Sequence, residues 1–126
     1  MTRSRPGVRS ARSSEIPYCP QQYDVVWINF DPQLGREQAS RRPAFVLSAG
    51  KYNAVTRLCL LCPITSQVKG YPFEVAIPEG GRTSGVVLSD QVKSFDWAAR
   101  KAELIESRSD LAAEVLGKLR AVLGAP

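Results

Sequence analysis

The chain has 126 residues and contains no histidine. Histidine is the side chain whose ordinary pKa lies nearest neutrality, and it is also the commonest protein ligand for transition metals. Proton transfer by this protein must therefore use groups that do not ordinarily titrate near pH 7. The three cysteines offer no second Cys pair, and without histidine nothing else completes a zinc shell. We expect no metal and no cofactor.

Long apolar runs are missing as well. The longest are only a few residues, whereas a membrane-spanning helix needs about 20. The N-terminal residues lack the apolar segment of a secretory signal. The cysteines are Cys19, Cys59 and Cys62, an odd number that cannot form a paired disulfide framework. These absences predict a cytoplasmic protein with no membrane association.

Cys59 and Cys62 form a C-x-x-C pattern inside the apolar run 58–62, which reads as a strand. Side chains alternate between the two faces of a strand, so residues three apart point in opposite directions. We expect two small core residues rather than a redox or metal site.

The net charge of +5 is unevenly distributed. Residues 1–20 carry four arginines and one glutamate, or +3, which leaves +2 for the remainder. We predict that residues 1–20 form a disordered basic arm, with non-specific phosphate contact as the alternative, and that residues 21–126 form one domain. In so mildly basic a domain, preference for a polyanion must come from a local patch.

Several short strands followed by one helix are expected. The β-branched and aromatic runs at 23–30, 42–48, 57–64, 73–77, 85–89 and 99–106 predict strands, and residues 50–53 predict a turn. Leu111, Val115, Leu119 and Val122 recur at helical spacing, with Ser109 as N-cap and Gly124 as the stop. The pattern predicts a mainly β fold with a C-terminal α-helix, a small curved barrel with the helix packed on it.

One polar loop concentrates chemically useful groups. Residues 36–43 read REQASRRP and run directly into the apolar strand that follows. Such a loop holds charged side chains at the rim of a rigid sheet, where binding and catalytic residues are commonly placed.

Five segments together resemble the MazF/PemK family of bacterial toxin ribonucleases. They are YDVVWINFDP, GREQASRRPAFVLS, KYN, CPITSQVKGYPFEV and VVLSDQVKSFDWAAR, in the family's order and spacing across about residues 23–123. The resemblance implies the SH3-like barrel of the MazF/CcdB/Kid toxins. It also implies a homodimer that cleaves single-stranded RNA sequence-selectively without metal, and a MazE-like antitoxin whose acidic C-terminal tail covers the groove.

The same resemblance assigns the site. The family's arginine before proline matches Arg42, its threonine after the third strand matches Thr65, and its loop glutamate matches Glu37. Expected RNA contacts come from the neighbouring polar side chains: Arg41, Gln38, Ser66, Gln67, Lys69 and Lys93. Arg41 stands where relatives often have histidine, and Thr65-Ser66 replaces two threonines, which bears on the RNA sequence recognised.

The chemistry of these residue types agrees with RNA cleavage. RNA supplies its own nucleophile, the 2′-OH beside each phosphodiester, so an enzyme needs mainly to align it and stabilise charge on the phosphoryl oxygens. A guanidinium fits those oxygens bidentately. With an ordinary pKa of about 12.5–13.8, a guanidinium is a poor general base, so the interpretation of Arg42 is electrostatic. Glu37 would orient Arg42 or accept the 2′-OH proton, and the identity of the acid and base stays open.

Two other functions are compatible with this fold: a DNA gyrase poison, and an SH3-like binding module without activity. Arg42 with Thr65 favours the nuclease, because a gyrase binder needs neither. Among the aromatic residues, Trp27 and Phe30 are expected in the core, and Trp97 in the core or an interface, with a base-stacking platform as the alternative.

Overall fold

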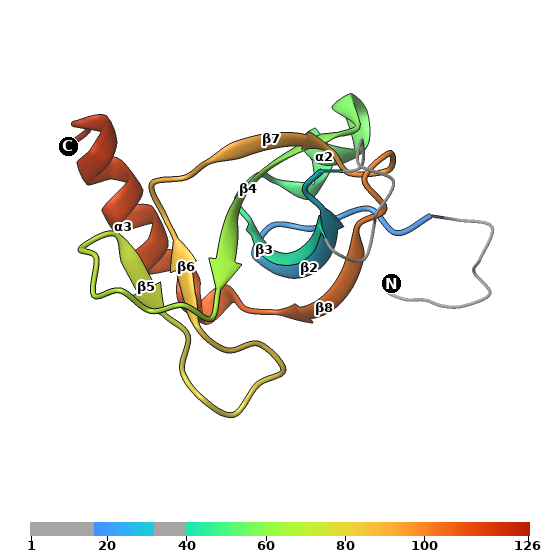
Figure 1. The fold of residues 1–126 in the computed structure, drawn as a ribbon. Helices are drawn as coiled ribbons and strands as arrows, with labels where there is room; N and C mark the ends of the chain where they lie inside the picture. The colour runs from blue at the N-terminus through green and yellow to red at the C-terminus, as the bar shows by residue number, and fades with distance from the viewer. Residues whose placement is uncertain (1–16, 32–39) are drawn as a thin grey trace.

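A computed structural model describes residues 17–31 and 40–126 of the chain. Seven strands in these ranges form one antiparallel sheet, in the order β5-β6-β4-β3-β2-β8, with β7 paired to β4. The strands are β2 (Asp24–Asn29), β3 (Arg41–Val46), β4 (Leu58–Thr65), β5 (Glu74–Ala76), β6 (Val86–Leu88), β7 (Lys93–Asp96) and β8 (Glu103–Ser107). The sheet is strongly curved but does not close, because β5 and β8 are its two ends (Figure 1).

Two helices lie at opposite sides of the curved sheet (Figure 1). Helix α2 (Gly50–Thr56) connects β3 to β4, and α3 (Ala112–Leu123) ends the described chain beside β5 and β6. A 3₁₀ turn at Ser109–Leu111 leads into α3. The mainly β fold with a C-terminal helix confirms the prediction of fold class. None of the helices in these ranges is long and apolar enough to cross a bilayer.

The two faces of the sheet pack into two apolar clusters. Val25, Phe45, Cys62, Leu111 and Val115 belong to the cluster beneath α3. The other cluster includes Val26, Ile28, Cys59, Leu61 and Trp97. Cys59 and Cys62 therefore lie on opposite faces of β4, as their spacing predicted. Burial is the main cause that raises the pKa of each thiol to about 12, so both are neutral at physiological pH.

Most predicted strands are confirmed within a residue or two, but four details were wrong. Residues 50–53 begin helix α2 rather than a turn, and β7 was missed. The last predicted strand starts at Glu103, because residues 97–101 form turns. Ser109 lies in the 3₁₀ turn, and α3 has no side-chain N-cap. Gly124 does end the helix, in a left-handed conformation with φ 69°.

The aromatic residues divide differently from expectation. Trp97 is in the core, and its indole N–H donates to the Asn53 carbonyl at 2.9 Å. Phe30 is half-buried and packs at 5.1 Å, edge to face, on Phe95. Trp27 is 43% exposed, so its assignment to the core was wrong.

The last residues of the predicted arm contact the domain. Tyr18 hydrogen-bonds to the Asp24 carboxylate, and the Pro20 carbonyl accepts from Asn53 Nδ2 at 2.8 Å. Residues 1–16 lie outside the described residues, so the basic arm stays a prediction. A truncated protein should keep residues 17–20, since they complete these contacts.

Asn53 is the polar centre of the α2 region, and its side chain is fully buried. Its amide donates to the carbonyls of Pro20 and Ser48 at 2.8 and 3.2 Å, and its Oδ1 accepts from the Ser48 hydroxyl at 2.5 Å. These bonds hold a short helix whose glycine, valine and threonine are poor helix formers.

We predict that Asn53→Ala lowers the free energy of unfolding by about 1–3 kcal/mol for each buried group left unpaired. Urea denaturation measures the change. Gln91→Ala, which removes an exposed amide, is the control and should change stability by no more than about 0.5 kcal/mol. Equal midpoints for the two variants would contradict the role given to Asn53.

Candidate active site

The pairing of β3 with β4 brings Arg42 and Thr65 together. Ala44 pairs with Pro63, and Arg42 and Thr65 each lie two residues beyond that pair, at the same end of the two strands. Both residues line the same two hollows. Two residues that are 23 positions apart in sequence therefore present their side chains to the same region of space.

Two hollows meet at this pair. The first has a volume of about 440 Å³, and the second about 530 Å³. Arg42, Thr65 and Gln67 line both. The first is completed by Lys69, Tyr71, Glu74, Leu88 and Gln91. The second is completed by Trp27, Pro43, Ile64, Ser66, Arg82, Thr83, Ser84 and Ile105.

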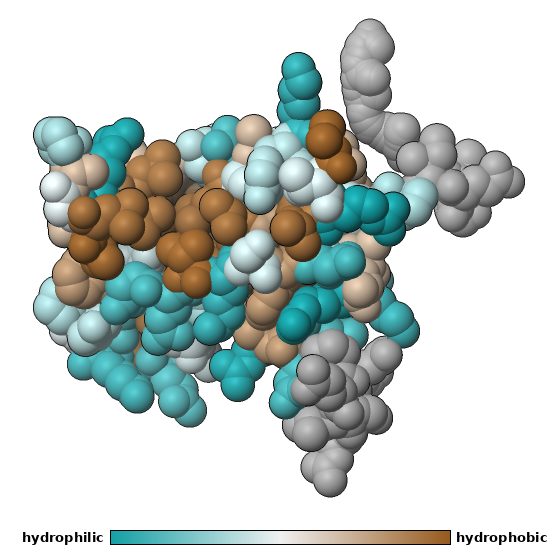
Figure 2. Space-filling view, turned by 90° about the horizontal axis from the view of Figure 1, so that it is seen from above, coloured by the Kyte–Doolittle hydropathy of each residue, from teal (hydrophilic) through white to brown (hydrophobic). Residues whose placement is uncertain are grey.

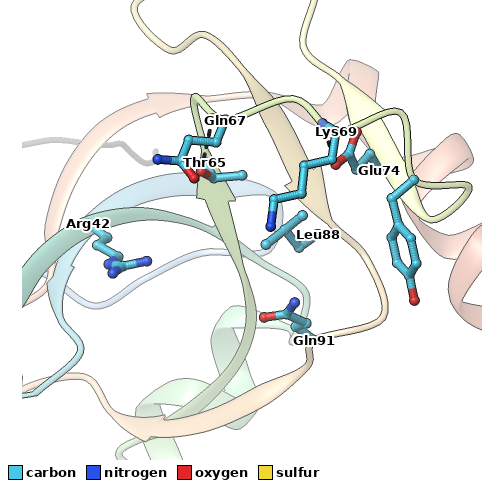
Figure 3. A pocket seen from close by; sticks show the side chains of 8 residues that line it. Arg42, Thr65, Gln67, Lys69, Glu74, Leu88 and Gln91 are labelled. Atoms are coloured by element: carbon cyan, nitrogen blue, oxygen red, sulfur yellow. Dashed lines mark hydrogen bonds between the residues drawn. The ribbon is translucent and has the colours of Figure 1, made fainter.

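Figure 3 shows the first hollow with the end of β4 at its centre. In this view Arg42 lies on one side of β4, and Lys69, Leu88 and Gln91 lie on the other. Thr65 and Gln67 are at the end of the strand. A ligand that bridges the two hollows must therefore pass over Arg42 and Thr65.

The Arg42 guanidinium is exposed and available to a ligand. Within residues 17–31 and 40–126 no hydrogen bond or ion pair holds it, and it lies over the Phe30 ring, with Cζ 5.9 Å from the ring centroid. An arginine that has no carboxylate partner keeps its planar set of donors free for an anion. This supports the predicted role of Arg42.

Thr65 is held at the last position of β4 and is half-buried. Its Oγ1 accepts a hydrogen bond from the Gln67 backbone N–H at 3.1 Å. That bond fixes the rotamer of the hydroxyl and leaves its proton free to be donated. The backbone carbonyl of Thr65 lies against Gly85, where an added Cβ would be only 2.2 Å from the carbonyl oxygen.

Arg41 is adjacent to Arg42 but points to the other face and lines neither hollow. Its guanidinium donates to Asn29 Oδ1 at 2.8 Å, to the Lys101 carbonyl at 2.7 Å and to Glu103 Oε1 at 2.5 Å. Only 19% of its side chain is exposed. The structure thus gives Arg41 a bracing contact between β3, β2 and β8, and its predicted contact with RNA stays a prediction.

The other predicted RNA contacts divide into three groups. Gln67 and Lys69 line the hollows, and Ser66 lines the second one. Lys93 is exposed on β7 and lines neither. Glu37 and Gln38 lie outside the described residues.

The loop that follows β4 is shaped by Glu74. The Glu74 carboxylate accepts the backbone N–H groups of Lys69 and Gly70, each at 3.1 Å. Nearby, the Tyr71 hydroxyl donates to Asp90 Oδ2 at 3.0 Å, and this hydrogen bond raises the pKa of Tyr71. These contacts hold Lys69 and Tyr71 at the wall of the first hollow.

Sequence reasoning missed much of the lining, notably Trp27, Tyr71, Leu88, Gln91 and Arg82. The position of Trp27 in the lining follows from the β2–β3 register, which puts it opposite Pro43, next to Arg42, and which the sequence alone does not give. Arg82 comes from the loop between β5 and β6, and no local sequence pattern predicts that it lies close to β8.

The site can bind and stabilise anionic oxygen atoms. Arg42 and Lys69 supply positive charge, and the Thr65 hydroxyl supplies a neutral donor. Across the described ranges, no three side chains of the types His, Cys, Asp and Glu come together as a metal site. The chemistry of the donors fits a phosphodiester better than a neutral ligand.

Comparison with known proteins identifies relatives over most of the chain. A family model described as "PemK-like, MazF-like toxin of type II toxin-antitoxin system" matches residues 21–124. The endoribonuclease toxin MazF of Escherichia coli (strain K12) is 53% identical over 85 residues, which cover 68% of this chain and 76% of that protein. The endoribonuclease PemK of Escherichia coli is 35% identical over 104 residues, which cover 78% of both.

Solved structures agree. MazF from Deinococcus radiodurans has a TM-score of 0.76 at 53% identity, covering 85% of this chain and 98% of that one. A MazE–MazF structure from the same organism has a TM-score of 0.76 at 47% identity, covering 86% and 99%.

The contact between Gly85 and Thr65 yields a prediction. Gly85 has φ +104°, and a Cβ there would overlap the Thr65 carbonyl, so Gly85→Ala must displace the backbone that carries the Thr65 hydroxyl. Gly80→Ala is the matched control, because Gly80 has φ +110° with no atom within 4 Å of the added Cβ. We expect Gly85→Ala to lower the free energy of unfolding by about 1–3 kcal/mol more than the control does, by urea denaturation. Equal losses would show that the close approach is unimportant.

Proposed function

Because this chain belongs to the family of PemK-like, MazF-like toxins of type II toxin–antitoxin systems, we propose that it cleaves single-stranded RNA at the rim shared by its two hollows. It is an endoribonuclease, as its curated relatives are. The observation that supports the site is that Arg42 and Thr65, from the paired strands β3 and β4, line the same two hollows. This argues against the gyrase poison and the inactive module, since neither needs that pair.

In the proposed reaction the 2′-OH of one nucleotide attacks the adjoining phosphorus. The P–O5′ bond breaks, the 2′-oxygen loses its proton, and the 5′-oxygen of the leaving nucleotide gains one. The products are a 2′,3′-cyclic phosphate and a 5′-OH. No external nucleophile enters, so the protein's task is to align the groups and stabilise the phosphorane-like charge.

Arg42 and Thr65 are the residues we assign to that charge. The Arg42 guanidinium donates two parallel N–H bonds to the non-bridging oxygens, and the Thr65 hydroxyl donates a third. Both come from strands packed on two sides by buried side chains, so their positions are set before substrate arrives. Preorganised donors of this kind stabilise a transition state without reorganisation.

The reaction also needs groups that accept the 2′-OH proton and donate one to the leaving 5′-oxygen. With no histidine in the chain, we propose that Glu37 either orients Arg42 or accepts the 2′-OH proton. Lys69 lies in the same hollow as Arg42 and adds positive charge. Gln67 and Ser66 are proposed to contact bases or phosphates on either side, with Gln38, Arg41 and Lys93 as more distant RNA contacts.

We further propose a homodimer, because one face of the protomer is apolar. Figure 2 shows apolar side chains gathered in a band that runs from the side of α3 across the face that carries β7. Val55 of α2, Leu58 and Leu60 of β4, and Val92 just before β7 are exposed. Contiguous exposed apolar surface commonly marks a protein interface.

A MazE-like antitoxin is the other proposed partner. The MazE–MazF structures from Deinococcus radiodurans support it, since the toxin chain in them matches this one closely. An acidic tail would suit a site built from Arg42 and Lys69, where it would replace the phosphates of RNA. We propose that the protein acts in the cytoplasm, where its mRNA substrate is found.

Cleavage should proceed in excess EDTA. The nucleophile belongs to the RNA, and the proposed charge stabilisation comes from side chains, so no metal-bound water is required. A single 2′-deoxy substitution at the scissile nucleotide should abolish cutting, and the products should carry cyclic phosphate and 5′-OH ends, as read by end-labelling. Strict metal dependence or 5′-phosphate ends would overturn the mechanism. Blocked gyrase supercoiling without RNA cleavage would support the gyrase alternative instead.

Arg42→Lys tests the role of the planar guanidinium. Lysine keeps the charge but meets the phosphoryl oxygens only as a point charge. We expect normal folding, retained RNA binding and a loss of about 100-fold or more in single-turnover rate. Thr65→Ala should act in the same direction but less severely.

Two controls accompany this test. Arg120→Lys, on the exposed side of α3, should leave the rate unchanged. Arg41→Ala should weaken RNA binding and lower stability through its lost contacts, while the rate in the bound state stays nearly intact. The assignment fails if Arg42→Lys keeps near-normal single-turnover cleavage, or if Arg41→Ala is the more damaging to that rate.

A further inference from the structure

The second hollow contains an aromatic side chain that the proposed chemistry does not use. Trp27 is 43% exposed and lines this hollow with Arg42 and Thr65. It belongs to neither apolar cluster. An exposed indole in a concave site beside Arg42 and Thr65 is a typical feature of a ligand-binding site.

The fold explains why Trp27 is uncovered. Val25, two residues earlier on β2, has its side chain on the same face, where Leu111 and Val115 cover it. Trp27 lies further along the strand, opposite Pro43 of β3 and Glu103 of β8. Leu111 and Val115 are packed in the cluster that contains Val25 and not against Trp27, whose indole stays exposed.

Polar side chains held by hydrogen bonds also line this hollow. Arg82 is exposed there, and its backbone N–H donates to Glu106 Oε1 at 3.0 Å. Glu106 is in turn bonded by Arg108 at 3.2 Å, which also pairs with Asp110. The Arg82 guanidinium also donates to the Ile105 carbonyl at 3.4 Å, so Arg82 belongs to a loop that is tied to β8, and Ser66 and Ser84 add hydroxyl groups to the lining of the hollow.

These features match one nucleotide of single-stranded RNA. A nucleobase stacks on an exposed indole whatever its sequence, and a guanidinium contacts the attached phosphate. A volume of about 530 Å³ falls in the usual range for small-molecule sites. Because Arg42 and Thr65 line the same hollow, a base on Trp27 must belong to a nucleotide next to the scissile phosphate.

We propose that the hollow formed by Trp27 and Arg82 is a stacking subsite that holds the nucleobase adjoining the cleaved bond. The inference rests on the proposed ribonuclease function and adds a residue pair that sets substrate affinity and register. Trp27 is a binding residue here and takes no part in proton transfer. Its loss should raise the RNA concentration needed for half-maximal rate and leave the saturated rate nearly unchanged.

The test compares Trp27→Leu with Trp27→Phe. Leucine keeps an apolar side chain but cannot stack, whereas phenylalanine retains a smaller ring. Cut sites on a long RNA are first mapped with the wild-type protein, and an RNA oligonucleotide containing one site is then used for single-turnover kinetics. We expect Trp27→Leu to raise the half-saturating concentration about 5- to 150-fold, and Trp27→Phe to raise it much less.

A second arm assigns the nucleotide. In otherwise identical oligonucleotides, one nucleotide on each side of the cut is replaced in turn by an abasic residue. For the wild-type protein, one of these replacements should raise the half-saturating RNA concentration about as much as Trp27→Leu does. For the Trp27→Leu variant, the same replacement should raise it almost no further. Arg82→Gln should weaken binding and make it less dependent on salt.

Fluorescence gives a readout independent of turnover. The chain has only two tryptophans, and Trp97 is buried. An oligonucleotide with 2′-deoxyribose at the scissile position should quench the emission of the wild-type protein and have little effect on Trp27→Phe.

The outcomes are distinct. Wild-type protein that cuts no RNA would remove the proposed function and this inference with it. The inference alone fails if wild-type protein cuts RNA while Trp27→Leu keeps its half-saturating concentration, or if both proteins respond equally to every abasic replacement. If Trp27→Leu weakens only inhibition by an antitoxin and leaves RNA kinetics unchanged, the hollow is a protein-binding site and the inference is wrong.

Discussion

The register between β3 and β4 is the constraint on which the site depends. Ala44, Phe45 and Val46 pair with Pro63, Cys62 and Leu61, and all six are buried. Since side chains alternate, a slip of one residue would move every one of them to the wrong face. Arg42 and Thr65 lie two residues beyond the Ala44–Pro63 pair, and both line the two hollows. Core packing thus holds in place the two strands that carry the side chains assigned to the chemistry.

The rest of the fold supports that pair from several directions. Arg41 braces the start of β3 against β2 and β8, while its neighbour Arg42 stays unpaired in the described structure. Gly85 allows β6 to approach the end of β4 closely. Glu74 orders the loop that carries Lys69. A flexible loop could not hold donors with comparable precision, and precise placement is what charge stabilisation requires.

Much of this could be predicted from the sequence, because apolar alternation and the segments REQASRRP and KGYPFEV carry strong signals. Helix α2 could not, since its stability comes from the burial of Asn53 rather than from helix propensity. Strand β7 has one buried residue, Phe95, and forms because β4 offers an edge. Trp27 is exposed because it lies beyond the part of the sheet that α3 covers. These are tertiary effects without a local pattern.

The most direct test of the account is a double-mutant cycle on Arg42→Lys and Thr65→Ala, measured as single-turnover cleavage of one RNA oligonucleotide. If both side chains donate to the same phosphoryl group, removing either one misplaces that group for the other. The double variant should then be much less impaired than the product of the two single losses. Losses that multiply fully would show that Arg42 and Thr65 act independently, and would contradict the central claim.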